Sequence, residues 1–299
     1  MTNFEITTHV LPNEPELRES VEAVLRRAEE NDGVAPFSEA FINGLGDARL
    51  GHEHLLIDDS SVAAVAPDGG VELVVSPELR GQGRGTHLVK QVLAEVENAS
   101  LWAHGNLPEA LQLAESLGLE TTRRLLVMSV GGAALEQAAV FEAPDGIEAL
   151  SYPQAVERFG RESVEQAWLD ANNDAFSWHP EQGGWDLDQL HRGMEADWFD
   201  PNGVLFLYSG EQLAGFHWTK MHPAEGSDVV GEVYVVGLAS AFRGQGMGDP
   251  LLRVGLDFLV RQGASTVILY VEADNVPAVA RYEDLGFAIT EDHVVYKRN

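Results

Sequence analysis

The sequence contains no cysteine, and that absence removes several kinds of chemistry at once. It excludes disulfide bonds, zinc sites built on thiolates, and a cysteine nucleophile. Positive charge is also scarce, because 19 Lys and Arg residues face 48 Asp and Glu residues and leave a formal net charge of −29. Charge of that sign repels polyanions, so we expect neither nucleic acid nor an anionic membrane as a general partner.

Long hydrophobic runs are missing as well. No segment approaches the roughly 18 apolar residues that a membrane helix needs, and the polar N-terminal segment lacks the apolar core of a signal peptide. We therefore expect a cytoplasmic protein with no membrane partner. The length of 299 residues suits two domains of about 150 residues each, and 44% hydrophobic residues supply a core for both.

The most informative stretch is a glycine-rich connection between a strand and a helix. Residues 233–236 predict a strand, and the apolar pattern over 251–259 predicts a buried helix. Between them lie Arg243, Gly246 and Gly248. Glycines at the start of a helix expose backbone N–H groups near the positive end of the helix dipole, which suits a diphosphate. The spacing Arg-x-x-Gly-x-Gly is neither the Rossmann nor the Walker pattern, and an ordinary tight turn is the alternative interpretation.

The same pattern occurs a second time. Arg80, Gly83 and Gly85 follow a predicted strand with the same spacing, at an offset of 243 − 80 = 163 residues. Further along, the segment that begins at Asn106 resembles the one that begins at Asn275, at an offset of 275 − 106 = 169 residues. Two ordered matches at nearly one offset indicate a duplicated domain.

The boundary between the two copies is predicted from composition. The segment 131–146 is rich in Ala, Gly and Glu and matches neither copy. We therefore place an N-terminal domain at 1–138 and a C-terminal domain at 139–299.

A base and an acid flank the glycine loop in the second copy alone. Glu232 opens the strand before the loop, and Tyr282 lies in the helix after Asn275. Subtracting the two offsets leads to Gly69 and Leu113 in the first copy, which can replace neither. Acyl transfer to an amine needs a base for the ammonium proton and an acid for the leaving thiolate. We therefore predict a catalytic second domain and a silent first one, although each residue alone also suits a plain structural role.

Two other segments were considered for sites. His52-Glu53-His54 places two imidazoles on one face of a strand, but no third ligand is nearby, so we expect no metal site. Ser38 is predicted to cap a short helix, with Glu39 in its first turn.

The two glycine loops resemble the acetyl-CoA loop of the GNAT N-acetyltransferases. With the segments Asp32-Gly-Val-Ala-Pro, His179-Pro-Glu-Gln-Gly-Gly-Trp and Glu232-Val-Tyr-Val-Val-Gly, almost the whole chain is similar to the tandem-GNAT mycothiol synthase family. The resemblance implies an α/β (α+β) fold of two tandem GNAT domains, each a mixed splayed β-sheet flanked by helices. It also implies acetyl transfer from acetyl-CoA to the cysteinyl amine of cysteinyl-glucosaminyl-inositol, the final step of mycothiol synthesis, without a metal.

The resemblance also implies which residues bind. The substrate positions are Glu39, Glu181, Lys220, Glu232 and Tyr270. The first acetyl-CoA site comprises Leu73, Val74, Val75, Arg80, Gly81, Gln82, Gly83, Arg84 and Gly85. The second comprises Val236, Gly237, Leu238, Arg243, Gly244, Gln245, Gly246, Met247, Gly248 and Asp249, together with Asn275, Val276, Pro277, Ala278, Val279 and Ala280.

A mechanism follows from these assignments. Backbone amides at 236–238 polarise the thioester carbonyl, Glu232 takes the ammonium proton through water, and Tyr282 protonates the leaving CoA sulfur. Glu39 and Glu181 suit a cationic, polyhydroxylated acceptor in a cleft between the domains, and a monomer is expected. Two alternatives remain, a GNAT enzyme for another amine such as an aminoglycoside, and a CoA-binding sensor without catalysis.

Overall fold

The protein forms two compact units, each of which is described by itself. The structure is a computed structural model, and it describes residues 4–177, 183–223 and 228–298. Unit 1 contains Met1–Leu126, Glu272–Asp274 and Glu291–Asn299, and unit 2 contains Val127–Val271 and Asn275–Thr290. The units are therefore not contiguous in sequence. The repeat boundary between residues 138 and 139 concerns sequence similarity and stays a prediction.

The sheet of unit 1 is mixed. It is built from β1 (Thr7–His9), β2 (Glu53–Ile57), β3 (Ser61–Val65), β4 (Gly70–Val75), β5 (Ser100–Ala103) and parts of β6 (Leu119–Gly131) and β12 (Ala288–Arg298). Their order is β1-β2-β3-β4-β5-β12-β6. The first four strands pair antiparallel, whereas β4 and β5 run parallel.

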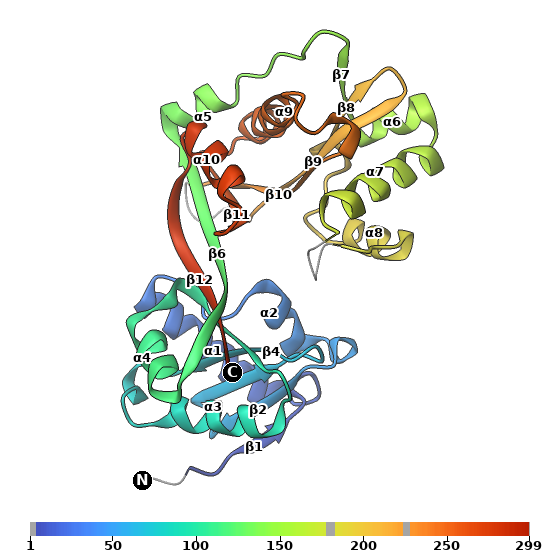
Figure 1. The fold of residues 1–299 in the computed structure, drawn as a ribbon. Coiled ribbons are helices and arrows are strands. Elements are labelled where there is room, and N and C mark those ends of the chain that lie inside the picture. Colours follow the sequence, from blue (N-terminus) through green and yellow to red (C-terminus); the bar gives the residue numbers. More distant parts are fainter. Residues whose placement is uncertain (1–3, 178–182, 224–227, 299) are drawn as a thin grey trace. The chain divides into compact units, whose positions relative to one another are not determined.

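Helices cover both faces of this sheet (Figure 1). The helices are α1 (Pro15–Asp32), α2 (Glu39–Gly46), α3 (Arg84–Glu95) and α4 (Pro108–Leu117). Val62 packs with side chains of α1 and α2, whereas its neighbour Ala63 packs with side chains of α3 and α4. Since successive strand residues point to opposite faces, a strand buried on both sides is apolar throughout, and all of β3 is buried.

The last strand of the chain completes unit 1. Residues 294–296 of β12 pair antiparallel with residues 101–103 of β5. Val294 and Tyr296 belong to the same buried cluster as Leu88 of α3. The core of unit 1 therefore contains residues from both ends of the sequence.

Unit 2 has the same architecture. Its strands are β7 (Ile147–Ser151), β8 (Val204–Ser209), β9 (Gln212–Met221), β10 (Val230–Leu238) and β11 (Thr266–Glu272), together with the remaining parts of β6 and β12. The order is β12-β6-β11-β10-β9-β8-β7, in which β10 and β11 are parallel and β7 to β10 pair antiparallel. Its helices are α5 (Gly132–Ala138), α6 (Tyr152–Phe159), α7 (Arg161–Ala175), α8 (Leu187–Met194), α9 (Gly248–Arg261) and α10 (Val276–Asp284).

Aromatic side chains dominate one face of the unit 2 sheet. Trp168 of α7 packs on Phe206, Phe216 and Trp218 of β8 and β9, with ring centroids 5.1–6.1 Å apart. On the other face, Leu251 and Val254 of α9 pack against the sheet. Such aromatic contacts add to the free energy of area burial and fix the position of α7.

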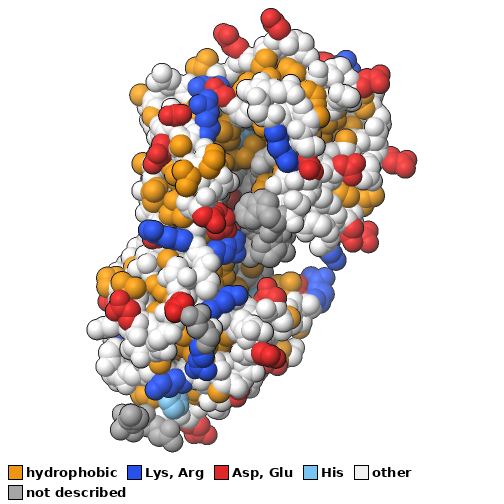
Figure 2. Space-filling view, in the orientation of Figure 1, with side chains coloured by type: hydrophobic (Ala, Val, Ile, Leu, Met, Phe, Trp, Pro, Cys, Tyr) orange, Lys and Arg blue, Asp and Glu red, His pale blue; other side chains and the backbone are white. Residues whose placement is uncertain are grey.

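The acidic side chains lie at the surface. On the face drawn in Figure 2, Asp and Glu side chains are scattered singly, with Lys and Arg among them. Among the described residues, no helix combines the length and apolar character that crossing a membrane requires.

Candidate functional site

Each unit has a glycine loop between a strand and a helix. In unit 1 a short 3-10 helix (Pro77–Leu79) connects β4 to α3, and in unit 2 another (Ser240–Phe242) connects β10 to α9. Gly81 and Gly83 have φ of 73° and 86°, and the residues 163 positions later, Gly244 and Gly246, have φ of 73° and 78°. A Cβ at any of the four would meet no protein atom within 4 Å. Glycine is therefore required there for the left-handed backbone rather than for space.

The parallel strands beside each loop separate. In unit 1, β4 pairs with β5 over Gly70 to Glu72 and no further, and in unit 2, β10 pairs with β11 over Val230 to Val233. The later parts of β4 and β10 remain hydrogen-bonded to β3 and β9, and a β-bulge interrupts β10 between Val233 and Val235. One edge of residues 73–75 and of residues 236–238 is thus left for a ligand. This is the predicted splayed sheet.

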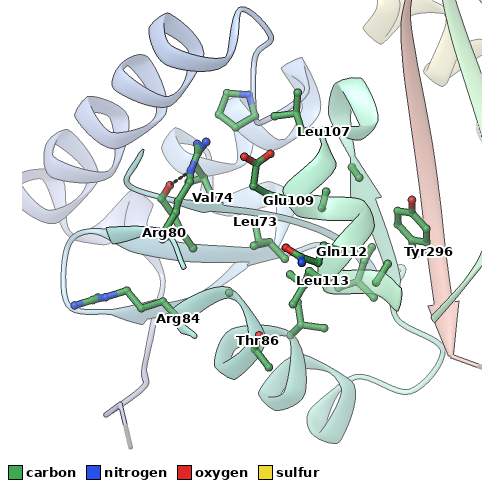
Figure 3. A pocket seen from close by; sticks show the side chains of 18 of the residues that line it. Leu73, Val74, Arg80, Arg84, Thr86, Leu107, Glu109, Gln112, Leu113 and Tyr296 are labelled. Atoms are coloured by element: carbon green, nitrogen blue, oxygen red, sulfur yellow. Dashed lines mark hydrogen bonds between the residues drawn. The ribbon is translucent and has the colours of Figure 1, made fainter. Parts of the chain in front are cut away.

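A cavity of about 520 Å³ lies beside the loop of unit 1 (Figure 3). Residues 73–75 and 80–85 line it, except Gln82. The remaining wall includes Trp102, His104, Glu109, Gln112, Leu113 and Tyr296. The predicted residues of the first acetyl-CoA site, apart from Gln82, therefore share one cavity.

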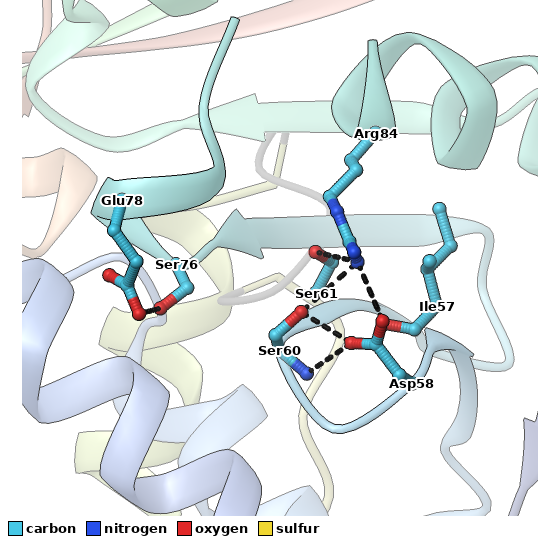
Figure 4. Close-up of polar contacts among 7 residues, drawn as sticks. All are labelled: Ile57, Asp58, Ser60, Ser61, Ser76, Glu78 and Arg84. Carbon is cyan, nitrogen blue, oxygen red and sulfur yellow. Dashed lines mark hydrogen bonds and ion pairs between the residues drawn. The ribbon is translucent and has the colours of Figure 1, made fainter. Parts of the chain in front are cut away.

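The arginines of the loops are engaged with carboxylates. Arg80 makes two hydrogen bonds of 2.7 Å to Asp32, and Arg243 makes one of 2.8 Å to Asp174. Arg84 contacts Asp58 Oδ2 at 3.0 Å and Ser60 Oγ at 3.1 Å (Figure 4). Each positive charge is thus balanced by a neighbouring negative one. Backbone amides, rather than net positive charge, distinguish these loops.

Glu232 is buried in unit 2 and paired. Its side chain is 7% exposed, and its Oε2 lies 2.7 Å from Nε2 of His222 at the end of β9. Directly across the ladder from Glu232 lies Lys220, whose ammonium lies 4.9 Å from the ring centre of Trp198. A solvated strand residue, the plain alternative for Glu232, is therefore wrong.

Tyr282 lies on α10 and is partly buried. Burial raises the pKa of its phenol to about 12, so the group stays protonated at neutral pH and can donate a proton. Its ring packs on Phe287, with centroids 5.9 Å apart. Asn275 is the N-cap residue of α10, and its side chain accepts a hydrogen bond from the Ala278 N–H. This cap is the local reason why the helix begins there.

The predicted acceptor residues have different standings. Glu39 is the first residue of α2 and is exposed, and Tyr270 on β11 is 49% exposed. Glu181 lies outside the described residues. The predicted side-chain cap of α2 by Ser38 is wrong, because the Ser38 backbone N–H instead donates to Glu72 Oε2 at 2.7 Å.

The comparisons with known proteins agree with this geometry. Residues 165–287 match the model of the Acetyltransferase (GNAT) family. A mycothiol acetyltransferase of Corynebacterium aurimucosum is 52% identical, over 99% of this chain and 100% of its own length. The chain belongs to the mycothiol acetyltransferase family. Another member, from Corynebacterium diphtheriae, is 46% identical over 94% of this chain and 93% of its own.

Solved structures support the fold of this family member. A tandem GNAT protein from the clavulanic acid biosynthesis pathway has a TM-score of 0.68 at 15% identity, covering 99% of this chain and 98% of its own. A GCN5-related N-acetyltransferase from Sphaerobacter thermophilus has a TM-score of 0.64 at 19% identity, covering 98% and 95%. The predicted fold of two tandem GNAT domains is confirmed.

The sequence analysis missed two groups of residues. One is His222, the partner of Glu232. The other is in unit 1, where buried Glu72 lies 3.0 Å from His104 Nε2, and His104 Nδ1 lies 3.3 Å from His293 Nδ1. A fixed offset from Glu232 led to Gly69 because it ignored the bulge in β10. An alternative signal was available, since Glu72 is a lone carboxylate in an apolar strand.

The histidines at 52 and 54 belong to the core of unit 1. His54 is fully buried, and burial lowers its pKa to about 4. Its neighbour His52 packs on Phe41, with ring centroids 4.9 Å apart. Both imidazoles therefore lie in the packed interior, as neutral rings at physiological pH.

Proposed function

We propose that this protein transfers the acetyl group of acetyl-CoA to the cysteinyl amine of cysteinyl-glucosaminyl-inositol, and that unit 2 carries the reaction. The observation that carries the proposal is the buried pair of Glu232 and His222 on the strands that lead to the second glycine loop. A carboxylate at this depth that retains a partner able to accept and release a proton suits a base. The name shared by the related proteins supplies the acceptor.

The reaction divides into two proton transfers and one bond exchange. Glu232, with His222 behind it, takes a proton from the acceptor ammonium through water. The free amine then attacks the thioester carbon, whose oxygen is polarised by the backbone N–H groups at the open edge of residues 236–238. The carbon–sulfur bond breaks, and the phenol of Tyr282 gives its proton to the departing sulfur. No covalent bond to the protein forms in this sequence.

Acceptor binding calls for carboxylates. Glu39 and Glu181 accept hydrogen bonds from sugar hydroxyls and pair with the ammonium, and Lys220 and Tyr270 complete the predicted set. The acceptor is then a polyhydroxylated cation rather than an apolar or anionic amine. The protein acts as a monomer in this proposal.

Unit 1 is proposed to hold acetyl-CoA or CoA without turning it over. The cavity beside its glycine loop supports the binding role, because the predicted contact residues other than Gln82 line it. Leu113 occupies the position that a phenol would need, and it lines the same cavity. Glu72 is engaged by His104 and by the Ser38 N–H, so its oxygens are occupied as hydrogen-bond acceptors.

An acceptor screen tests the proposal. Acetyl-CoA is incubated with cysteinyl-glucosaminyl-inositol, an aminoglycoside or free cysteine, and product mass and total free thiol are measured. N-acetylation of the sugar thiol leaves its thiol free and releases the CoA thiol, so total thiol rises by one per turnover. The protein adds no background because it has no cysteine. Turnover with the aminoglycoside alone would favour the other GNAT class, and CoA binding without any turnover would favour a sensor.

A further inference from the structure

Two aspartates lie at the wrong ends of their helices. Asp32 is the last residue of α1, and Asp174 is the last but one of α7. The C-terminal end of a helix carries partial negative charge, which disfavours a carboxylate there. Each aspartate is offset by an arginine of the glycine loop in the same unit, Arg80 for Asp32 and Arg243 for Asp174.

The same arginines also hold the ends of the strands. Arg80 Nε donates to the Val75 carbonyl and Arg243 Nε to the Leu238 carbonyl, each at 3.2 Å and each five residues earlier in the chain. One guanidinium therefore joins the end of the strand to the end of the preceding helix. The base of the loop is closed in the same way in both units.

The two clamps differ in one instructive detail. In unit 2, Asp174 Oδ2 accepts a second hydrogen bond from the Ser240 N–H at 2.9 Å. The residue 163 positions earlier is Pro77, which has no N–H to donate. In unit 1, Asp32 instead gives one oxygen to each terminal nitrogen of Arg80. The contact between helix and loop is thus retained although one of its donors is lost.

The clamps leave the loop arginines with little capacity for phosphate. Both terminal nitrogens of Arg80 and its Nε are engaged by protein acceptors. The Arg243 guanidinium is engaged through Nε and one terminal nitrogen. The positive-φ glycines that follow each arginine set the direction of the loop amides.

We infer that Asp32 and Asp174 are positioning residues, which hold Arg80 and Arg243 so that the loop amides, rather than the guanidinium groups, bind the diphosphate of acetyl-CoA. The inference rests on the proposed function in that acetyl-CoA is the ligand. It assigns a role to two residues outside the predicted sites. It also changes the role of the arginines from phosphate ligands to supports of the loop.

The test compares Asp174→Ala and Arg243→Lys with the wild-type protein. CoA affinity is measured by calorimetry, and the KM for acetyl-CoA and kcat by steady-state kinetics. We expect both variants to weaken CoA binding and raise that KM by about three- to tenfold, with kcat and the acceptor KM little changed. Arg243→Lys keeps the charge but cannot span the carbonyl and the carboxylate as a planar fork does. The double variant should be no worse than the weaker single one, since the pair acts as a unit.

The opposite model makes opposite predictions. If Arg243 were a phosphate ligand that Asp174 competes for, Asp174→Ala would free it and CoA would bind more tightly, while Arg243→Lys would bind nearly as wild type. Either result would overturn the inference. Asp170→Asn is the matched control, because Asp170 is exposed one turn earlier on α7 and contacts Gln166. That variant should bind CoA as wild type does.

Calorimetry separates failure of the inference from failure of the proposed function. A wild-type protein that binds no CoA would refute the acetyl-CoA assignment itself, whereas unchanged affinity in Asp174→Ala would refute only the clamp. Tryptophan fluorescence checks that each variant is folded. In unit 1, Asp32→Ala should weaken the first CoA site in the same assay, and unchanged binding there would count against the shared design.

Discussion

Acid should destabilise unit 2 through one buried histidine. His217 on β9 is completely buried, and its Nδ1 lies 2.9 Å from the Leu251 carbonyl in the first turn of α9. Burial lowers the pKa of this imidazole to about 4, from 6.5. The folded state therefore binds this proton more weakly than the unfolded state does. Stability from the neutral ring is fully present above the unfolded pKa of 6.5, and it falls between that value and about 4.

The magnitude follows from proton linkage. At about pH 5 the difference in proton binding costs about 2 kcal/mol, and it approaches about 3.4 kcal/mol below the folded pKa. The group is fully buried, so solvent does not reduce this figure as it would at a surface. A loss of that size is a large fraction of the stability of an ordinary domain.

Tryptophan fluorescence is a suitable assay because five of the six tryptophans lie in the sequence range of unit 2. Urea unfolding is followed at about pH 7.5 and about pH 5 for the wild type and for His217→Gln. The amide of Gln can still donate to the Leu251 carbonyl but does not titrate. We expect the variant to lose about 2 kcal/mol less than the wild type between the two pH values. Equal losses in both proteins would refute the assignment of this pH dependence to His217.

Further predictions concern catalysis, packing and acceptor binding. Glu232→Gln should lower turnover by roughly 10²–10⁴, most strongly at low pH, and a wild-type pH profile would remove the residue from the mechanism. Tyr282→Phe should slow thioester cleavage in single-turnover assays while CoA affinity stays unchanged; a normal rate would exclude it as the acid. Gly255→Ala should destabilise unit 2 by at least about 1–3 kcal/mol in urea unfolding, because its Cβ would meet the His217 ring at 2.1 Å, and an unaltered midpoint would contradict that contact. Glu39→Ala should raise the KM for the sugar thiol but not for acetyl-CoA, and free cysteine should be a poor acceptor; the acceptor proposal fails if neither is observed.

Local patterns predicted the parts of the fold that depend on nearby residues. The strand, glycine turn and helix at each loop were predicted because periodicity, positive-φ glycines and spacing all act within about 20 residues. The repeat then identified the second loop. Asn275 as a helix start followed from the same kind of local signal.

Partners that are distant in sequence were not predictable in this way. Asp32 and Arg80 are 48 residues apart, and Asp174 and Arg243 are 69 apart, so no local pattern joins them. Glu72 escaped because a constant offset assumes strands without insertions, whereas β10 has a bulge. The pairing of Val294 with Ala103 spans most of the chain and depends on the whole topology.

That last pairing has a consequence for how the protein is made. The ribosome completes residues 1–126 long before it reaches Val294 and Tyr296, yet these two side chains belong to the core beside Leu101 and Leu88. Until then β5 lacks the neighbour that β12 provides, and an open strand edge can pair with other chains. Tyr296 also lines the cavity of unit 1, so that cavity acquires its final wall only with the last residues of synthesis. The N-terminal half is therefore the first to be synthesised and cannot be the first to be finished.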